Sequence, residues 1–169
     1  MSEVSLHPAA VPLAQLLAEC EARRQRRSGP GGQHRNKVET AVILTHLPTG
    51  IRGEASERRS QEQNRQAAVV RLRLNLAIDV RAATGETPSE RWQGRVRGGR
   101  IEISSNHDDF AAIIAEALDV LHCREWDTKS ASAFLSITSS QLTKLLAREP
   151  RALAKLNDER AARGFKPLR

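Results

Sequence analysis

Apolar residues follow two different periods along the chain, which predict strands in its first part and helices in its second. Residues 41–46 form a β-rich run, and residues 51–55 form another one after the tetrapeptide LPTG at 47–50. A proline and a glycine between two such runs are typical of a tight turn. Residues 41–55 are therefore predicted to form an antiparallel hairpin.

Two elements and a loop precede this hairpin. Pro12 and the leucines that follow it predict a short helix, and residues 19–27 predict a strand that four arginines make strongly basic. The next residues, 28–32, read SGPGG. Three glycines and a proline exclude regular secondary structure and permit unusual backbone angles, so a loop is expected there.

Residues 60–80 are compatible with two structures. Ser60 and Gln63 have the spacing of a capping box, and a helix from this point places one set of apolar residues on a single face. That set is Ala67, Val70, Leu74, Ala77 and Ile78. Residues 70–76 also alternate like a strand, but a segment of about twenty residues is too long for a typical strand. We therefore predict a helix.

The rest of the chain is predicted to be mostly helical. The sequence ATGE at 83–86 has the composition of a linker. Thr87 as the N-cap, Pro88 in the first turn and Glu90 as the acid of a capping box predict the start of a helix, and Trp92 is expected in its core. These residues mark the beginning of a second structural region.

A short strand at 100–103 and four helices complete this region. The first helix is expected to be capped by Asn106 with Asp109, and the others span 128–134, 139–148 and 150–163. The clearest apolar stripe of the chain belongs to the first of them and consists of Phe110, Ile113, Ile114, Ala117, Leu118 and Leu121.

The predicted fold class is α+β. Antiparallel strands with a helix form a small first domain at residues 1–84, and a mainly α-helical region follows at residues 85–169. A chain of 169 residues can form one ordinary domain or two small ones, so a large multidomain enzyme is excluded.

The charge balance narrows the expected partners to polyanions. The chain has 27 basic and 20 acidic residues and a net charge of +7. Arginine dominates the basic residues, and its guanidinium group can bind two phosphate oxygens at once. Nucleic acid is therefore the favoured partner, although a genome rich in G and C would also raise the arginine content.

Several other classes of protein are not expected. Cys20 and Cys123 are too few for a disulfide framework, and His122 next to Cys123 lacks the spacing of a zinc site. No stretch approaches the ~20 apolar residues that span a bilayer. We expect a cytoplasmic protein that acts as a monomer, with no metal, no cofactor and no membrane partner.

Candidate chemistry is concentrated in residues 28–37. No Gly-x-Ser-x-Gly motif is present, and residues 29–32 have neither the spacing of a Walker motif nor that of a dinucleotide-binding loop. The tripeptide Gly31-Gly32-Gln33 remains. A glutamine amide does not titrate near neutral pH, so Gln33 cannot be a general base, and any catalysis there must be positional and electrostatic.

The residues around this tripeptide identify a family. From Arg27 the chain reads RSGPGGQHRNKVETAVILTHLPTGI, followed at residue 57 by ERRSQEQNRQA. This pattern closely resembles the catalytic domain of class I peptide-chain release factors over residues 28–67. One departure is Arg35, where the family commonly has a small apolar residue.

The resemblance implies hydrolysis of the ester that joins a nascent peptide to its tRNA in the large ribosomal subunit. In the family, the backbone N–H at the position of Gln33 stabilises the charge that develops in the transition state, while the side chain orients water. Gly31 and Gly32 allow the close backbone approach. A preorganised donor of this kind is worth ~3 to 4 kcal/mol. The catalytic glutamine is often methylated in the family, which makes Gln33 a candidate for modification.

The expected partners are ribosomal RNA of the large subunit and peptidyl-tRNA. The candidate RNA-binding residues are Arg23, Arg24, Arg26, Arg27, Arg35, Lys37, Arg58 and Arg59. His34 and His46 are expected to be structural or to contact RNA. Because 169 residues leave no room for the codon-reading regions of full release factors, we expect codon-independent rescue of stalled ribosomes or of split large subunits.

A different class of function is a binding protein without hydrolase activity. Residues 132–146 have the pattern of a helix-turn-helix in which the second helix presents Gln141 and Lys144 to RNA or DNA. Two packed helices of a small bundle would give the same pattern. An interaction adaptor is a third possibility, but it would have no need of the Gly-Gly-Gln tripeptide.

Overall fold

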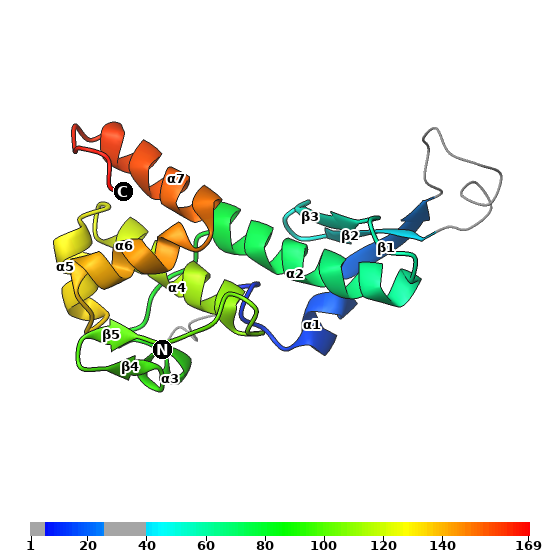
Figure 1. Cartoon of the computed structure of the whole chain (residues 1–169), viewed down its shortest axis with the longest axis horizontal. Coiled ribbons are helices and arrows are strands. Elements are labelled where there is room, and N and C mark those ends of the chain that lie inside the picture. The colour runs from blue at the N-terminus through cyan, green and yellow to red at the C-terminus, as the bar shows by residue number, and fades with distance from the viewer. Residues whose placement is uncertain (1–5, 26–39) are drawn as a thin grey trace. The chain divides into compact units, whose positions relative to one another are not determined.

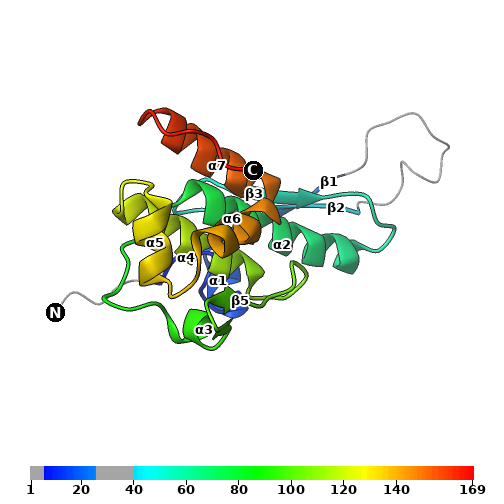
Figure 2. The ribbon, with the colours of Figure 1, turned by 60° about the vertical axis from the view of Figure 1, so that its left-hand side comes forward.

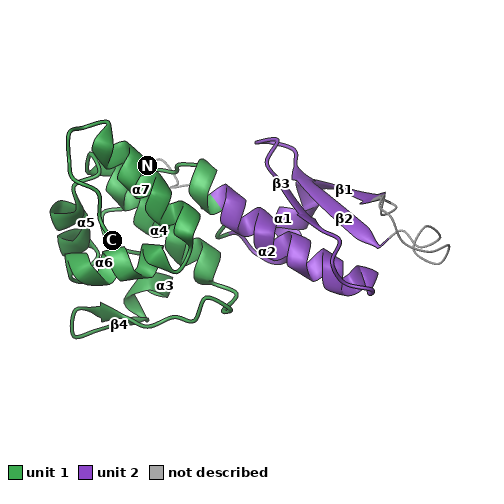
Figure 3. Cartoon of the chain, turned by 45° about the horizontal axis from the view of Figure 1, so that its top comes forward, with its two compact units in different colours: residues 1–10, 77–169 green, residues 11–76 purple. Residues whose placement is uncertain are grey.

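The structure is a computed structural model that describes residues 6–25 and 40–169. The chain divides into two compact units (Figure 3). Residues 11–76 form the first, here called the sheet unit, and residues 1–10 together with 77–169 form the second, here called the helical unit. The predicted α+β class is confirmed, and the helices predominate toward the C-terminus.

The sheet unit contains three antiparallel strands and two helices (Figure 1). Its elements are α1 (Leu13–Ala18), β1 (Cys20–Gln25), β2 (Ala41–His46), β3 (Arg52–Ala55) and α2 (Gln61–Asp79), whose last turn passes into the helical unit. The predicted hairpin, the short helix after Pro12 and the basic strand are confirmed within these residues. The predicted loop at 28–32 lies outside the described residues.

The strand register determines which side chains enter the core. In β1, Cys20 lies opposite His46 and Gln25 lies opposite Ala41, while β3 pairs with β2 through Val42 and Ala55. Burial alternates along β2, with Val42, Leu44 and His46 buried. Successive strand residues face opposite sides of a sheet, so this alternation shows that one side forms the core.

The packing of β3 against α2 depends on a glycine. A Cβ atom added to Gly53 would lie 2.3 Å from the carbonyl oxygen of Ala68 and 2.4 Å from the amide nitrogen of Leu72. No side chain larger than hydrogen fits in that space. The backbones of the strand and the helix therefore meet directly at Gly53.

Helix α2 confirms the helical interpretation of residues 60–80, but of the predicted face only Ala77 and Ile78 are buried. The Ser60 hydroxyl accepts a hydrogen bond from the Gln63 amide at 3.4 Å, as a cap does. The fully buried residues are Asn64, Ala68, Leu72, Leu76 and Ala77, with Ile78 also buried. Val70, predicted on the core face, is 56% exposed. The contact with Gly53 brings Ala68 and Leu72 against the sheet and so turns Val70 outward.

The helical unit is built around α4. Its elements are α3 (Glu90–Gln93), β4 (Val96–Arg97), β5 (Arg100–Ile101), α4 (Phe110–Cys123), α5 (Thr128–Phe134), α6 (Ser139–Ala147) and α7 (Pro150–Ala161). Helices α5, α6 and α7 all pack against α4 (Figure 2). The predicted stripe on α4 is buried along its whole length. Trp92 is also buried, and its Nε1 donates to the carbonyl of Leu135 at 2.9 Å.

Two predicted helix caps in this unit are wrong. The N-cap of α3 is Ser89, whose hydroxyl accepts from the Trp92 amide, so Thr87 does not cap the helix. Helix α4 begins at Phe110, and the Asp109 side chain makes no capping hydrogen bond. Two guanidinium groups bind the Asp109 carboxylate instead. Such charge-assisted hydrogen bonds are roughly twice as strong as neutral ones.

The arginines that bind Asp109 come from the segment around α3. Arg91 Nε lies 3.1 Å from one oxygen of the carboxylate, and Arg95 Nη2 lies 2.6 Å from the other. The start of α4 is thereby joined to α3 and to the residue that precedes β4. Neither partner is close to Asp109 in the sequence, so helix-start patterns did not indicate this pairing.

Residues 132–146 fold as α5, a short turn and α6. Leu142, Leu145 and Leu146 are buried where α6 packs against α4, α5, α7 and β5, while Lys144 is exposed. The leucines of the helix-turn-helix pattern thus belong to the core of a bundle.

A buried histidine connects the two segments of the helical unit, residues 1–10 and residues 77–169. The Ala9 amide donates to Nδ1 of His7, which leaves Nε2 to donate to the carbonyl of Val80. This arrangement needs a neutral imidazole, and burial lowers the pKa of His7 to about 4. Arg81 follows Val80, and its Nη1 lies 3.1 Å from Oδ1 of Asp119. Burial raises the pKa of Asp119 to about 7, although the Arg81 guanidinium opposes the increase.

The first prediction concerns the contact at Gly53. The substitution Gly53→Ala should lower the free energy of unfolding by about 3 kcal/mol, because the added methyl group must displace the backbone of α2. Urea unfolding followed by far-ultraviolet circular dichroism measures the change. Gly85→Ala is the control, since its Cβ would meet nothing closer than 3.4 Å. Equal stability of the two variants would contradict the packing described for β3.

The second prediction concerns pH. The folded-state pKa of His7 lies below its ordinary value of 6.5, so its contribution to stability is lost as pH falls from about 6.5 to about 4. The folded-state pKa of Asp119 lies above its ordinary value of 3.8, so its contribution is lost as pH rises from about 4 to about 7. The two effects oppose each other over the same interval.

Single substitutions should separate these effects. Asp119→Asn should make the unfolding free energy fall more steeply on acidification than in the unmodified chain, and His7→Gln should make it fall less steeply or rise. Both tryptophans lie in the helical unit, so denaturant titrations followed by tryptophan fluorescence at a series of pH values report on this unit. Parallel pH profiles for all three proteins would show that neither residue titrates as described.

Candidate active site

The tripeptide Gly31-Gly32-Gln33 and four of the candidate basic residues lie outside the described residues. These four are Arg26, Arg27, Arg35 and Lys37. The structure does describe both ends of the segment that contains them. Gln25 is the last residue of β1, Ala41 is the first of β2, and the two are partners in the antiparallel ladder. The Cα atoms of such partners are about 5 Å apart, so residues 26–40 leave and rejoin the sheet at neighbouring points.

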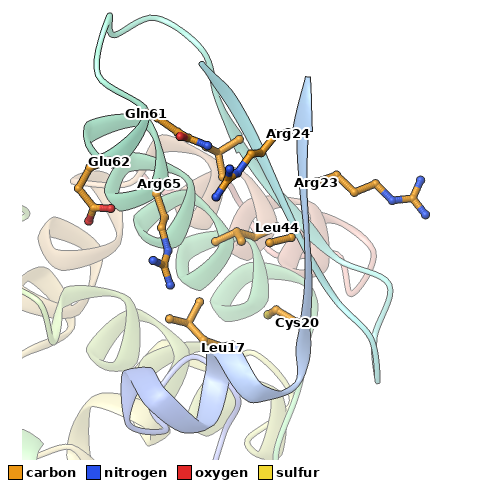
Figure 4. A pocket seen from close by; sticks show the side chains of 10 residues that line it. Leu17, Cys20, Arg23, Arg24, Leu44, Gln61, Glu62 and Arg65 are labelled. Atoms are coloured by element: carbon orange, nitrogen blue, oxygen red, sulfur yellow. The ribbon is translucent and has the colours of Figure 1, made fainter. Parts of the chain in front are cut away.

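The described arginines of β1 lie on opposite sides of the sheet. Arg23 is opposite Ile43, and Arg24 is opposite the buried Val42. Arg23 pairs with Glu21 at 3.3 Å, and Figure 4 shows it extending away from the space between β1 and α2. Arg24 extends into that space (Figure 4). The two candidate basic residues that the structure describes in β1 therefore lie on opposite faces of the sheet.

Arg58 and Arg59 lie in the connection between β3 and α2, and both are exposed. The backbone of Arg58 is held by hydrogen bonds to a buried side chain of α2, which leaves its guanidinium group on the surface. The connection therefore presents two cations next to the first turn of α2.

A pocket of about 400 Å³ lies between α1, β1, β2 and the first turns of α2 (Figure 4). Apolar side chains, among them Leu17, Val42 and Leu44, form one part of its lining. The guanidinium groups of Arg24 and Arg65 enter it from β1 and from α2 (Figure 4). The full lining is Leu17, Cys20, Ala22, Arg23, Arg24, Val42, Leu44, Gln61, Glu62 and Arg65.

This lining is suited to a ligand that has both a flat apolar ring and an anionic group. Aliphatic side chains accept an aromatic face, and guanidinium groups bind phosphate oxygens with defined geometry. The one thiol in the lining, Cys20, is a poor candidate for a nucleophile because burial raises its pKa, and the neighbouring Glu19 raises it further. The lining thus combines an apolar wall with guanidinium groups that can bind phosphate oxygens.

His46 is structural, one of the two roles expected for it. It is 2% exposed, its Nδ1 lies 2.8 Å from the Thr49 hydroxyl, and its Nε2 lies 3.2 Å from a carboxylate oxygen of Glu19. These contacts connect the turn of the hairpin to the start of β1. His34, by contrast, lies outside the described residues.

Two residues of α2 belong to the site although no motif singled them out as functional. Arg65 enters the pocket, and Asn64 lies fully buried beside the connection that carries Arg58. Arg65 follows Gln61 by four residues, which places both on one face of a helix. Both residues also lie in the segment ERRSQEQNRQA that resembles the family, but a role for Arg65 becomes apparent only once the opposite wall of the pocket, β1, is known.

The two units differ strongly in charge. The sheet unit has 12 basic and 6 acidic residues, and the helical unit has 15 basic and 14 acidic residues. Almost all of the net positive charge of the chain therefore belongs to the unit that holds the Gly-Gly-Gln segment.

Comparison with known families agrees with this geometry. The RF-1 domain model matches residues 17–109, which is more than half of the chain. The match begins in α1 and includes all three strands of the sheet, α2 and the Gly-Gly-Gln segment. The chain therefore belongs to the RF-1 domain family, that of the class I peptide chain release factors.

Curated relatives carry the same description. The chain is 38% identical over 80 residues to the chloroplastic peptide chain release factor PrfB1 of Arabidopsis thaliana, an alignment that covers 43% of the chain and 18% of that protein. It is 46% identical over 70 residues to peptide chain release factor 1 of Xylella fastidiosa, covering 40% and 19%. With peptide chain release factor 1 of Acidiphilium cryptum it shares 55% identity over 58 residues, covering 34% and 16%. The chain spans less than a fifth of the length of these relatives.

Within residues 6–25 and 40–169, no helix combines the length and the apolar character that a bilayer crossing requires.

The third prediction tests the pocket. Arg24→Ala and Arg65→Ala should each weaken binding to single-stranded RNA, and each should lower the slope of log K against log salt by about 0.7 if its guanidinium neutralises one phosphate. Fluorescence anisotropy with a labelled oligonucleotide at several salt concentrations measures both quantities.

The matched control for these variants is Arg163→Ala in the helical unit. Arg163 is already paired with Glu159 at 2.9 Å, so its removal should leave the slope nearly unchanged. If Arg24→Ala and Arg65→Ala behave like this control, the pocket is not a phosphate-binding site.

Proposed function

We propose that this protein hydrolyses the ester bond of peptidyl-tRNA on the ribosome and so releases the nascent peptide. The observation that carries the proposal is the family match over residues 17–109, which includes the intact tripeptide Gly31-Gly32-Gln33. The geometry of the sheet supports it, because the pairing of Gln25 with Ala41 fixes both ends of the segment that holds the tripeptide.

The proposed chemistry uses the protein backbone. The Gln33 side chain is an uncharged amide and can orient water through hydrogen bonds, but it cannot remove a proton. Its backbone N–H stabilises the negative charge that develops as the ester is attacked. Gly31 and Gly32 let the backbone approach the reacting atoms without steric conflict. The ribosome and the tRNA provide the remainder of the site. Methylation of Gln33 is a modification that this role would accommodate.

The charge distribution supports RNA as the partner. Catalysis requires the sheet unit to enter a site formed by ribosomal RNA of the large subunit, and this unit carries the excess of basic residues. Arg24 and Arg65 in the pocket, with Arg58 and Arg59 at the start of α2, are the described residues proposed to contact phosphate. The protein is proposed to act as a monomer on cytoplasmic ribosomes.

We further propose that release does not depend on a stop codon and that it rescues stalled ribosomes or split large subunits. Residues 1–84 are assigned the catalytic role, and residues 85–169 are assigned contact with the ribosome. The helical unit supports this assignment, because residues 110–169 follow the matched region as packed helices with a defined surface.

The fourth prediction is catalytic. Gln33→Ala and Gly32→Ala should each lower the rate of peptide release by roughly two to three orders of magnitude, because each disturbs a preorganised hydrogen-bond donor. Release of labelled peptide is measured with ribosomes that hold peptidyl-tRNA at a stop codon or at the end of a truncated mRNA, and with isolated large subunits.

These substrates also separate the possible triggers. Activity on truncated-mRNA ribosomes or on large subunits, without a stop codon, is the expected result. A strict requirement for a stop codon would contradict the rescue role while leaving the hydrolytic role intact. No release from any substrate by the unmodified protein would contradict both.

A further inference from the structure

The side chain of Asn64 binds Thr40, the described residue that follows the segment containing Gly31-Gly32-Gln33. It lies in the first turns of α2 and is 0% exposed. Its Nδ2 donates to the carbonyl of Thr40 at 2.6 Å and to the carbonyl of Arg58 at 2.9 Å. Its Oδ1 accepts from the amide of Arg58 at 2.9 Å. Both donor hydrogens of the carboxamide therefore have a partner, and so does its acceptor.

The partners of Asn64 have clear positions in the chain. Thr40 directly follows residues 26–39 and precedes the first ladder residue of β2, Ala41. Arg58 belongs to the exposed connection between β3 and α2. One buried side chain thus joins helix α2 both to the end of the segment that carries Gly31-Gly32-Gln33 and to a basic connection.

We propose that Asn64 is a positioning residue for peptide release, holding the backbone at Thr40 so that the Gly-Gly-Gln segment meets the ester in a productive orientation. This inference rests on the proposed function. The strand pairing ends at Ala41, so the hydrogen bond to Thr40 extends the constraint one residue further toward the segment.

Few other side chains could replace asparagine here. Aspartate has the same shape, but its ionised carboxylate cannot donate and would face two carbonyl oxygens. Alanine leaves both carbonyls and the Arg58 amide without this partner. Glutamine has the same groups, but its extra methylene would not fit a fully buried site of this size. The arrangement thus requires a short side chain that donates twice and accepts once.

Helix α2 also offers a matched control. Asn75 donates from its Nδ2 to the carbonyl of Arg52 at 2.6 Å, the same kind of bond between the helix and a strand. Arg52 is the first residue of β3 and pairs with Thr45, at the end of the sheet where the hairpin turn lies. Substitution of Asn75 therefore removes a similar hydrogen bond without touching Thr40.

The fifth prediction compares these two asparagines in peptide release from ribosomes that hold labelled peptidyl-tRNA. Asn64→Ala should lower the rate at saturating protein roughly 10- to 100-fold, with little change in the protein concentration that gives half the maximal rate. Asn75→Ala should leave both quantities close to those of the unmodified protein. The folded fraction of each variant is measured by circular dichroism under the assay conditions, and the rates are compared per folded molecule.

A second variant tests the hydrogen bond itself and does not depend on the alanine variant being folded. Asn64→Asp keeps the size of the side chain and can still accept from the Arg58 amide. Burial beside two carbonyl oxygens raises the pKa of the introduced carboxyl, and its protonated form can again donate to Thr40. The rate of Asn64→Asp relative to the unmodified protein should therefore rise as pH falls, whereas the relative rate of Asn75→Asp should not.

The possible results are distinct. Equal saturating rates for Asn64→Ala and Asn75→Ala, or a relative rate of Asn64→Asp that does not change with pH, would overturn the positioning role. If the unmodified protein released no peptide, the proposed function itself would fail. Activity of the unmodified protein together with inactivity of Gln33→Ala shows that the assay reports on the Gly-Gly-Gln segment.

Discussion

The pairing of Gln25 with Ala41 is the constraint on which the proposed site depends. These two residues end the ladder between β1 and β2, and they bring the beginning and the end of residues 26–40 next to each other. Helix α2 supports the sheet through the direct backbone contact at Gly53. The chemistry proposed for Gly31-Gly32-Gln33 depends on this support.

In the proposed function, an uncharged catalytic amide must be held against a highly charged RNA. The described part of the sheet unit presents arginines on both faces of β1, in the pocket and in the connection before α2. In the helical unit, several basic side chains form ion pairs with acidic side chains of the same unit. Arg81 is paired with Asp119, and Arg91 and Arg95 both bind Asp109. These three arginines therefore stabilise the helical unit, whereas most of the net positive charge of the chain lies on the sheet unit.

Local patterns in the sequence predicted most elements, and contacts between distant residues explain what they missed. The hairpin at 41–55 could be predicted because alternation and turn residues act locally, and the stripe on α4 because nearly every position of that helix is buried. The buried face of α2 was predicted only at Ala77 and Ile78, because the contact of Gly53 with Ala68 and Leu72 selects the rest of it. The tripeptide could be found from its neighbours in the sequence, whereas Asn64 and Arg65 gain their roles only through Thr40, Arg58 and Arg24.

The central claim is that the sheet unit places the Gly-Gly-Gln segment at the ester bond inside the large ribosomal subunit. Electron cryo-microscopy of the Gln33→Ala variant bound to large subunits that hold peptidyl-tRNA tests this claim directly. The account predicts density for residues 31–33 beside the terminal ribose of the tRNA, with Arg24 and Arg65 facing ribosomal RNA. Density for the sheet unit at a site remote from the tRNA terminus would contradict it.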